Sequence, residues 1–293
     1  MSSGGLNIAA LARRTGVAPD TLRKWEQRYE ILRPRRTSGG QRRYSEVDVA
    51  RVEWLTARLA EGYRIGEAAA LLGPGPEPGE SGATSRTPEE QLEAAFAAAQ
   101  ASDVEAVTRT LDQAFALHPL AETLERVVAP LLRRVGDAWQ AEELTVAQEH
   151  LVSAAVRARI ERLLSDARGG VRGAAVLACA PGERHELGLL MLAVLLRADG
   201  WQVAYLGADL PVTEAFALAD LLKARAVCLS VTMGEHAARL AQALDATARP
   251  ESATVFAGGA AAGAPELEAR GIAHLNHDLA SAVAELRALA DAG

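Results

Sequence analysis

The sequence predicts a multidomain protein: a small all-α head, a four-helix bundle and a doubly wound parallel α/β domain, in that order. The first observation is uneven charge. Residues 1–72 carry 13 Lys/Arg and 8 Asp/Glu, a net charge of +5. Because the whole chain has a net charge of −7, the remaining residues carry −12. The second is GPGPEPGESGATSRTP, whose four Gly and four Pro favour a flexible linker. The third is a change from helical periodicity to short apolar runs near SDARGGVRG. The expected divisions are 1–72, 73–88, 89–168 and 169–293.

Composition argues against a membrane or secreted protein. The longest apolar stretches are interrupted by charge before they reach membrane-spanning length, and the N-terminal MSSGGLNIAA lacks a signal pattern. Cys179 and Cys228 both lie in apolar runs typical of buried strands. They indicate reduced core cysteines rather than a disulfide framework or a metal cluster. We therefore expect a cytoplasmic protein.

The head begins with two short helices. LNIAALARRTG has apolar residues at helical spacing and ends at Gly16. A second helix follows, with Asp20 as the expected N-cap and with Leu22 and Trp25 facing inward. Its outward side chains are basic: Arg23, Lys24 and Arg28. Two short helices joined by a tight turn are typical of a helix-turn-helix, whose second helix fits the major groove of DNA.

A basic hairpin follows these helices. LRPRRTSGGQRRY contains five arginines and no acidic residue between positions 33 and 44: Arg33, Arg35, Arg36, Arg42 and Arg43. Gly39-Gly40 supplies the expected turn of a hairpin, which we call the wing (residues 33–44). A charge run is usually only a solvated face. Arginines on both arms of a glycine turn, next to a basic helix, favour contact with a DNA backbone instead.

Residues 6–72 resemble the MerR family of winged helix-turn-helix regulators. The order of IAALARRTGV, LRKWEQRY, PRRTSGGQRRYSEVDV and the helix VARVEWLTARLAEGYRIGEAAALL carries this resemblance. It implies promoter DNA binding by dimers or higher assemblies, with a ligand sensed by the C-terminal part. The DNA-contacting residues that it implies are Arg23, Lys24, Arg28, Arg35, Arg36, Arg42 and Tyr44.

The C-terminal part alternates strand and helix patterns. VRGAAVLACA, WQVAYLG, ARAVCLSV, ATVFAGG and IAHL are five apolar runs separated by amphipathic segments, which predicts a parallel sheet covered by helices, a flavodoxin-like fold. Ligands bind such sheets at the carboxyl ends of the strands. PGERHELG follows the first strand, SVTMGE the third and AGGAAAG the fourth, so all three are expected at one edge. The first loop lacks the GxGxxG of dinucleotide-binding proteins, and by itself it also fits an ordinary solvated turn.

These three loops resemble the cobalamin-binding module. The family pattern D-x-H-x-x-G, then a Ser-containing stretch, then Gly-Gly, corresponds to Glu183-x-His185-x-x-Gly188, Ser230-Val231-Thr232 and Gly258-Gly259. The resemblance implies that His185 is the lower axial cobalt ligand and that the other loops leave room for the nucleotide tail. Glu183 stands where the wider family has Asp, but light-sensing MerR relatives also use Glu. A carboxylate there can hold the second imidazole N–H and raise the basicity of the ligand.

The middle segment predicts four helices, at about 90–101, 103–117, 120–138 and 143–165. Within them, WQAEELTVAQEHL places Trp139 nine residues before Glu149-His150. This fits a core Trp and a surface Glu-His pair, but the W-x9-E-H spacing also resembles the CarH/LitR class of cobalamin photoreceptors. That resemblance implies an adenosylcobalamin cofactor, with Trp139 capping the adenosyl group and Glu149 and His150 contacting it.

One position departs from that class. Its well-known members carry His after the Trp, and this His can take the upper cobalt site after light removes the adenosyl group. Here the position is Gln140, and an amide is a poor cobalt ligand beside imidazole. His150, His118 or water are the alternatives. His236, His274 and His277 are assigned to helix starts or the surface, with no function.

The resemblances together imply a light-responsive transcriptional regulator, a repressor rather than an enzyme. It would bind promoter DNA as an adenosylcobalamin-dependent dimer or tetramer in the dark and leave it after Co–C photolysis. Three alternatives remain. The first is a light-independent cobalamin-level sensor. The second is a corrinoid-carrying enzyme subunit, which the basic head and the lack of a barrel-sized catalytic domain disfavour. The third is a regulator whose pocket no longer binds cofactor.

Overall fold

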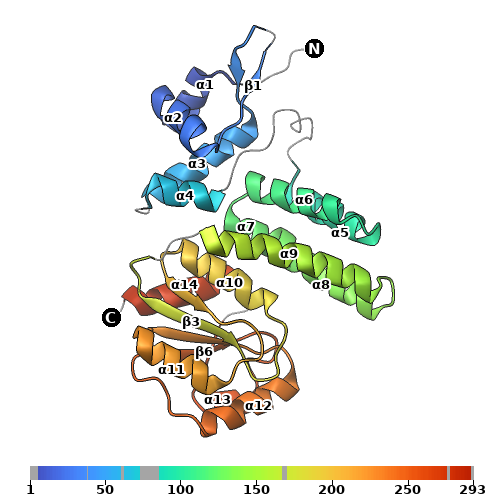
Figure 1. The fold of residues 1–293 in the computed structure, drawn as a ribbon, viewed down its shortest axis with the longest axis vertical. Helices are drawn as coiled ribbons and strands as arrows, with labels where there is room; N and C mark the ends of the chain where they lie inside the picture. The colour runs from blue at the N-terminus through green and yellow to red at the C-terminus, as the bar shows by residue number, and fades with distance from the viewer. Residues whose placement is uncertain are drawn as a thin grey trace. The chain divides into compact units, whose positions relative to one another are not determined.

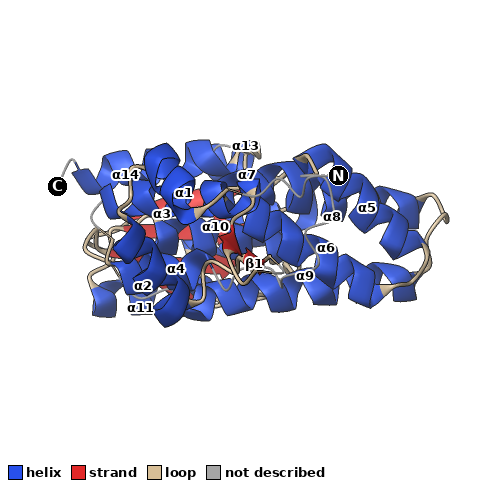
Figure 2. Cartoon of the chain, turned by 90° about the horizontal axis from the view of Figure 1, so that it is seen from above, coloured by secondary structure: helices blue, strands red, loops and turns tan. Residues whose placement is uncertain are grey.

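The computed structural model describes residues 6–37, 39–60, 63–72, 86–166, 170–275 and 278–291. Contacts divide the chain into two compact units, Met1–Arg159 and Ile160–Gly293. This division falls inside a long helix, whereas the sequence placed a boundary at residues 168 and 169. Residues 73–85 of the predicted linker 73–88 lie outside the described residues. Most of the described chain is helical, and strands are a minority (Figure 2).

The head consists of four helices and a short hairpin. Their bounds are α1 (Ile8–Thr15), α2 (Pro19–Tyr29), β1 (Arg35–Arg36), β2 (Arg42–Arg43), α3 (Glu46–Ala60) and α4 (Ile65–Leu72). Gly16 ends α1 with φ 73°, as the sequence predicted. The prediction that Asp20 caps α2 is wrong. Pro19 begins the helix because its fixed φ suits the first helical position, so Asp20 lies in the first turn and pairs with Arg23 at 2.6 Å.

The wing is anchored to the core of the head. Arg35 pairs with Arg43 and Arg36 with Arg42 in an antiparallel register, and Gly40 turns the chain with φ 77°. Directly after β2, Tyr44 exchanges two backbone hydrogen bonds of 2.8 Å with Leu6. Its side chain is fully buried in the head core. That core also contains Leu11, Leu22, Trp25, Ile31, Leu32, Val49, Val52 and Leu55.

The four predicted bundle helices are present. Their bounds are α5 (Pro88–Gln100), α6 (Val104–Leu117), the continuous run of α7 (Leu120–Thr123), η1 (Leu124–Val128) and α8 (Ala129–Gln140), and α9 (Val146–Asp166). Thr87 and Glu90 form a reciprocal capping box at the start of α5. Segment η1 is a π-helical turn in which the Ala129 N–H bonds to Leu124 O. The following residue, Pro130, has no N–H to give, so a widened turn at this place accommodates it.

The C-terminal unit is built on a five-stranded parallel sheet. The strands are β3 (Ala174–Cys179), β4 (Gln202–Tyr205), β5 (Ala226–Ser230), β6 (Thr254–Gly258) and β7 (Ala273–His274), in the order β4-β3-β5-β6-β7. In Figure 1, α10 (Leu187–Ala198) and α14 (Leu279–Asp291) cover one face of the sheet. The other face is covered by α11 (Val212–Leu222), α12 (Gly234–Asp245) and α13 (Pro265–Glu268). The predicted flavodoxin-like arrangement is confirmed.

The strand order reverses at β3, which has β4 on one side and β5 on the other. Such a reversal opens a crevice at the carboxyl ends of the strands, where open α/β sheets bind ligands. All six residues of β3 and all five of β5 are buried. Cys179 and Cys228 are buried in this core, as the sequence predicted, and no disulfide joins these two described residues. Among the described residues, no helix has the length and apolarity that a membrane span requires.

Leu177 provides a test of this core. It lies at the middle of the sheet with no solvent exposure, so Leu177→Ala removes buried apolar contacts and leaves a cavity. We expect a loss of about 2 to 5 kcal/mol in the free energy of unfolding of the C-terminal unit. Leu221→Ala is the matched control, because that side chain is 78% exposed, and it should change stability by less than about 0.5 kcal/mol. Chemical denaturation of the full chain compares them; similar losses for both variants would contradict the placement of Leu177.

Candidate functional site

The candidate site lies at the carboxyl edge of the sheet, in the loop between β3 and α10. Gly182 turns this loop with φ 86°, and a Cβ there would lie 2.5 Å from the Arg239 guanidinium. The loop after β4 is bound to this loop by two hydrogen bonds. The Gly182 N–H donates to Asp209 Oδ1 at 2.7 Å, and the Asp209 N–H donates to Glu183 O at 2.9 Å.

The carboxylate of Glu183 is fully buried and is the centre of the site. Its Oε1 accepts hydrogen bonds from the backbone N–H of His185 at 2.9 Å and from Nδ1 of the same residue at 2.6 Å. Its Oε2 accepts from the Thr232 N–H at 2.7 Å, the Thr232 hydroxyl at 2.6 Å and the Met233 N–H at 3.3 Å. His236 Nδ1 completes the set at 3.1 Å. Donors from two loops and one helix thus meet at one side chain.

These donors determine the charge of Glu183. Burial alone would raise the pKa of its carboxyl, because a charged group loses water. The hydrogen bonds from Thr232, from the His185 backbone and from His236 outweigh burial and hold the pKa well below its usual range. Glu183 is therefore ionised at neutral pH and accepts from both histidine rings.

The imidazole of His185 is oriented by this carboxylate. Its side chain is 67% exposed, while its Nδ1 is held by Glu183 and lies 3.1 Å from the Thr232 hydroxyl. A neutral ring that donates through Nδ1–H presents a lone pair on Nε2, and no described residue hydrogen-bonds to that atom. An exposed imidazole nitrogen with a lone pair is a suitable ligand for cobalt. His185 therefore fits the cobalamin that the sequence resemblance implies.

The other predicted loops meet the histidine loop at this edge. The Ala180 N–H bonds to Ser230 O at 2.9 Å, and the Val231 N–H bonds to Gly258 O at 2.8 Å. At Gly259 a Cβ would lie only 2.4 Å from Val231 O, so the close approach of these loops requires glycine there. A Cβ on Gly188 would meet nothing within 4 Å. Among the described residues there is therefore open space beside Gly188.

The predicted bundle residues lie together at one end of the bundle, in the first unit. Trp139 is 44% exposed at the end of α8, so it is not a core residue. The Glu149 carboxylate accepts from His150 Nδ1 and from the Ser153 hydroxyl, each at 2.5 Å. Gln140 is exposed beside Trp139. His118 instead contacts Arg86 O at 3.1 Å near the start of α5, while the start of α9 reaches Gln100 at the other end of α5.

In the head, the predicted DNA-contacting residues divide into two groups. Arg23, Lys24, Arg28, Arg35 and Arg36 are exposed on α2 and β1. The other two face Glu26 of α2. Arg42 Nε donates to its Oε1 at 2.9 Å, and the Tyr44 hydroxyl donates to its Oε2 at 3.0 Å. Burial first, and then the charge of Glu26, raises the pKa of Tyr44. Tyr44 was also predicted to contact DNA, but its side chain is fully buried. Unlike the exposed residues of that set, it holds the wing against α2.

Sequence reasoning missed three supporting contacts at the sheet edge. His236 does lie at a helix start, in the first turn of α12, but it is buried and bonded to Glu183 rather than exposed. Asp209 lies in the loop after β4, a loop for which no role was predicted, and its carboxylate accepts from the Gly182 N–H. The Tyr205 hydroxyl donates to Glu186 Oε2 at 2.7 Å. Position at or just after the carboxyl end of a strand could have indicated these residues, since these positions all reach the same edge. His274 lies exposed in β7, and His277 lies outside the described residues.

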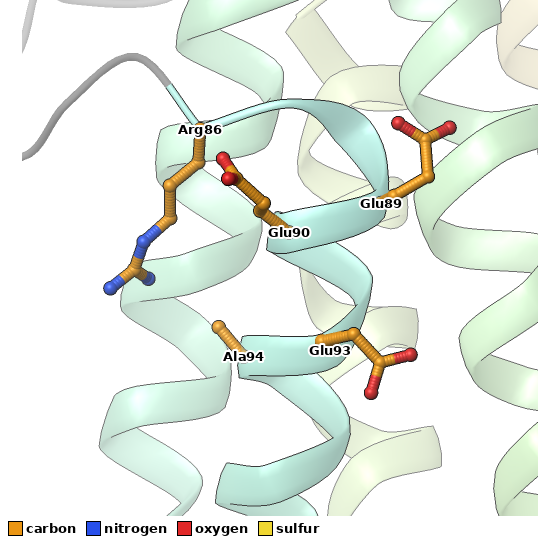
Figure 3. A pocket seen from close by; sticks show the side chains of 5 residues that line it. All are labelled: Arg86, Glu89, Glu90, Glu93 and Ala94. Carbon is orange, nitrogen blue, oxygen red and sulfur yellow. The ribbon is translucent and has the colours of Figure 1, made fainter.

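A shallow concavity at the start of α5 is a different kind of feature. Figure 3 shows its lining side chains: Arg86, Glu89, Glu90, Glu93 and Ala94. Each carboxylate already has a partner within the bundle. Glu89 pairs with Arg126 and Glu93 with Arg134, both at 2.5 Å, and Glu90 caps the helix. The charges of Glu89 and Glu93 are thus paired within the bundle, and the Glu90 carboxylate is used at the helix start.

Comparison with known protein families matches three segments of the chain. A family model described as MerR HTH family regulatory protein matches residues 6–73. Two models described as B12 binding domain match residues 173–284 and 91–164. Over 272 residues the chain is 39% identical to the HTH-type transcriptional repressor CarH of Myxococcus xanthus, covering 88% of this chain and 89% of that protein. The chain belongs to the CarH family.

A second relative and a solved structure extend the comparison. The HTH-type transcriptional repressor CarA of Myxococcus xanthus is 38% identical over 218 residues, covering 70% of this chain and 69% of CarA. The monomethylamine corrinoid protein of Methanosarcina barkeri superposes with a TM-score of 0.60 at 19% identity, covering 69% of this chain and all of that one. That likeness shows a shared fold. This CarH-family chain therefore joins a MerR-type head to a helical region and a sheet domain of the cobalamin-binding class.

The ionised state of Glu183 predicts how stability depends on pH. Because its pKa is lower in the folded than in the unfolded chain, its contribution is complete above the unfolded value near 4.5 and declines as pH falls below it. Glu183→Gln should lower the melting temperature at pH 7, and its deficit should shrink below about pH 4.5. Glu214→Gln, at an exposed position of α11, is the control. Thermal unfolding of the cofactor-free protein from pH 7 to 4 measures this; a deficit independent of pH would contradict it.

Proposed function

We propose that this protein is a light-responsive transcriptional repressor that binds promoter DNA as an adenosylcobalamin-dependent oligomer in the dark. The observation that carries the proposal is the exposed His185 imidazole, held by a buried ionised carboxylate, in a chain that begins with a basic winged head. Membership in the CarH family supports it, since the relatives CarH and CarA are both described as transcriptional repressors.

In this proposal the sheet edge holds the lower face of the cofactor. His185 Nε2 is the lower axial cobalt ligand, and Glu183 fixes the tautomer through Nδ1. Small residues of the other two loops leave room for the nucleotide tail: Ser230, Thr232, Gly258 and Gly259. Gly188, three residues after His185 in the same motif, is also proposed to lie against the cofactor. Bound adenosylcobalamin supplies a Co–C bond that light can break.

The bundle end is proposed to contact the adenosyl group. An aromatic side chain that is 44% exposed at a helix end has apolar surface available for a flat ligand, and Trp139 offers it. Glu149 and His150 lie on the first turns of α9, where they offer hydrogen-bonding groups. An amide at Gln140 binds cobalt weakly, and His118 contacts Arg86 away from this end. His150 or water is therefore the proposed occupant of the upper position after illumination.

The head is proposed to bind duplex DNA through α2 and the wing. The exposed Arg35 and Arg36 on the wing and Arg23, Lys24 and Arg28 on α2 supply the positive charges. Arg42 and Tyr44 support DNA binding indirectly in this proposal. Both side chains bind Glu26 and so fix the wing relative to α2.

Light is proposed to act through assembly. Several heads in one oligomer bind neighbouring half-sites together, and their joint affinity exceeds that of one head through effective concentration. Loss of the adenosyl group would release the contacts of Trp139 and disperse the oligomer. The second candidate is a light-independent cobalamin-level sensor, which the same sheet-edge geometry would serve. An enzyme subunit is disfavoured, because the relatives over most of the chain are repressors.

The wing predicts a change in salt dependence. Arg36→Ala should weaken binding of the full-length protein to duplex DNA and reduce the slope of log Kd against log salt by about 1, since one phosphate contact is lost. Arg109→Ala is the matched control, because this arginine is exposed on α6 of the bundle and pairs with Glu105 at 3.6 Å. Fluorescence anisotropy over a salt series measures both. Equal slopes for all three proteins would exclude the wing from the interface.

The light response is tested by size-exclusion chromatography of the protein loaded with adenosylcobalamin. We expect a larger assembly in the dark and a smaller one after green light, with a matching fall in DNA affinity. His185→Ala should elute as the smaller species in both conditions and show a changed cobalamin spectrum, because the lower ligand is gone. One elution position before and after light, with unaltered DNA affinity, would reject the photoreceptor and favour the cobalamin-level sensor.

A further inference from the structure

A second histidine shares the carboxylate that holds His185. His236 Nδ1 lies 3.1 Å from Glu183 Oε2, on the opposite oxygen from the one that binds His185. The imidazole of His236 is buried, and its Nε2 lies 3.2 Å from Oε1 of the exposed Glu235. Its two ring nitrogens therefore face different carboxylates, one in the site and one at the surface.

The donors on Glu183 Oε2 come from two sources. Thr232 and Met233 belong to the loop after β5 and approach through backbone groups and one hydroxyl. His236 is the side-chain donor that reaches this oxygen from α12. It also packs against the turn that precedes Glu183, since a Cβ on Gly182 would lie 3.2 Å from its ring. Helix α12 is thus tied to the histidine loop at two adjacent points.

We propose that His236 is a positioning residue for His185, acting through Glu183. A carboxylate can rotate about its last side-chain bond unless both oxygens are held. His236 and Thr232 hold Oε2, so Oε1 stays in line with Nδ1 of His185 and keeps the proton on that nitrogen. The Nε2 atom of His185 then remains the one with a lone pair. The role of that atom as a cobalt ligand rests on the proposed function; the control of its tautomer does not.

Three variants separate the hydrogen bond of His236 from its packing. The side-chain nitrogen of Asn is as many bonds from Cα as Nδ1 of His, so His236→Asn keeps a donor toward Glu183. The nitrogen of Gln corresponds to Nε2, so His236→Gln directs its donor toward Glu235 instead. His236→Leu fills the space with no donor. Because Asn and Gln are both amides of similar polarity, they form the matched pair.

The first readout uses the cofactor-free full-length protein. ¹⁵N spectra of selectively labelled histidines, with His185 assigned by its loss in His185→Ala, report which ring nitrogen carries the proton. We expect His185 to be protonated at Nδ1 in the wild type and in His236→Asn, and to become a mixture of tautomers in His236→Gln and His236→Leu. The second readout is the affinity and spectrum of bound cobalamin, with about tenfold weaker binding in the Gln and Leu variants.

The outcomes divide as follows. An unchanged His185 tautomer in both the Gln and Leu variants overturns the proposal. Equal loss in the Asn, Gln and Leu variants also overturns it, because packing alone would then explain the effect. If Leu prevents folding, the Asn and Gln pair still decides. If the wild type binds no cobalamin, the proposed function fails, but the tautomer measurement still supports or rejects the role of His236.

Discussion

The buried carboxylate of Glu183 is the interaction on which the candidate site depends. An ionised carboxylate that is removed from water is costly unless its oxygens accept hydrogen bonds from the protein. Its donors come from the loop after β3, the loop after β5 and the first turn of α12. Satisfying one charge therefore requires the loop after β3 to close against the continuous stretch that leads from β5 into α12. Folding of this edge and orientation of His185 are consequences of a single electrostatic requirement.

The sheet topology determines where this can happen. Because β3 and β5 are neighbours and parallel, their following loops leave the sheet side by side. The reversal of strand order at β3 sends the chain to opposite faces of the sheet and leaves an open edge beside the histidine loop. His185 can then have one ring nitrogen bound to a buried group and the other exposed. A site within the packed layers could not offer both environments to one small ring.

Local periodicity was sufficient to predict the four bundle helices and the five strands, because both patterns depend on neighbours only a few residues apart. The motif order also brought His185, Thr232 and Gly259 to one edge correctly. The residues that were misassigned depend on contacts between positions far apart in the sequence. Tyr44 resembled a surface residue because its partner Glu26 is 18 residues away on another element. His236 was assigned to a helix start without function because its partner Glu183 is 53 residues earlier. Only the pairing of β5 with β3 brings those two side chains together.

The π-helical turn at Leu124–Val128 has a consequence for how this bundle can vary between related proteins. Each residue of an α-helix advances the chain by about 100° around its axis. Deleting one residue from the turn would restore a regular α-helix and leave the later side chains, Trp139 included, facing nearly as they do now, because a π-helical turn accommodates one extra residue. Pro130 resists that repair, since a proline cannot join the regular ladder. A deletion within the regular part of α8, between Leu131 and Ala138, would instead turn Trp139 by about 100° around the helix axis.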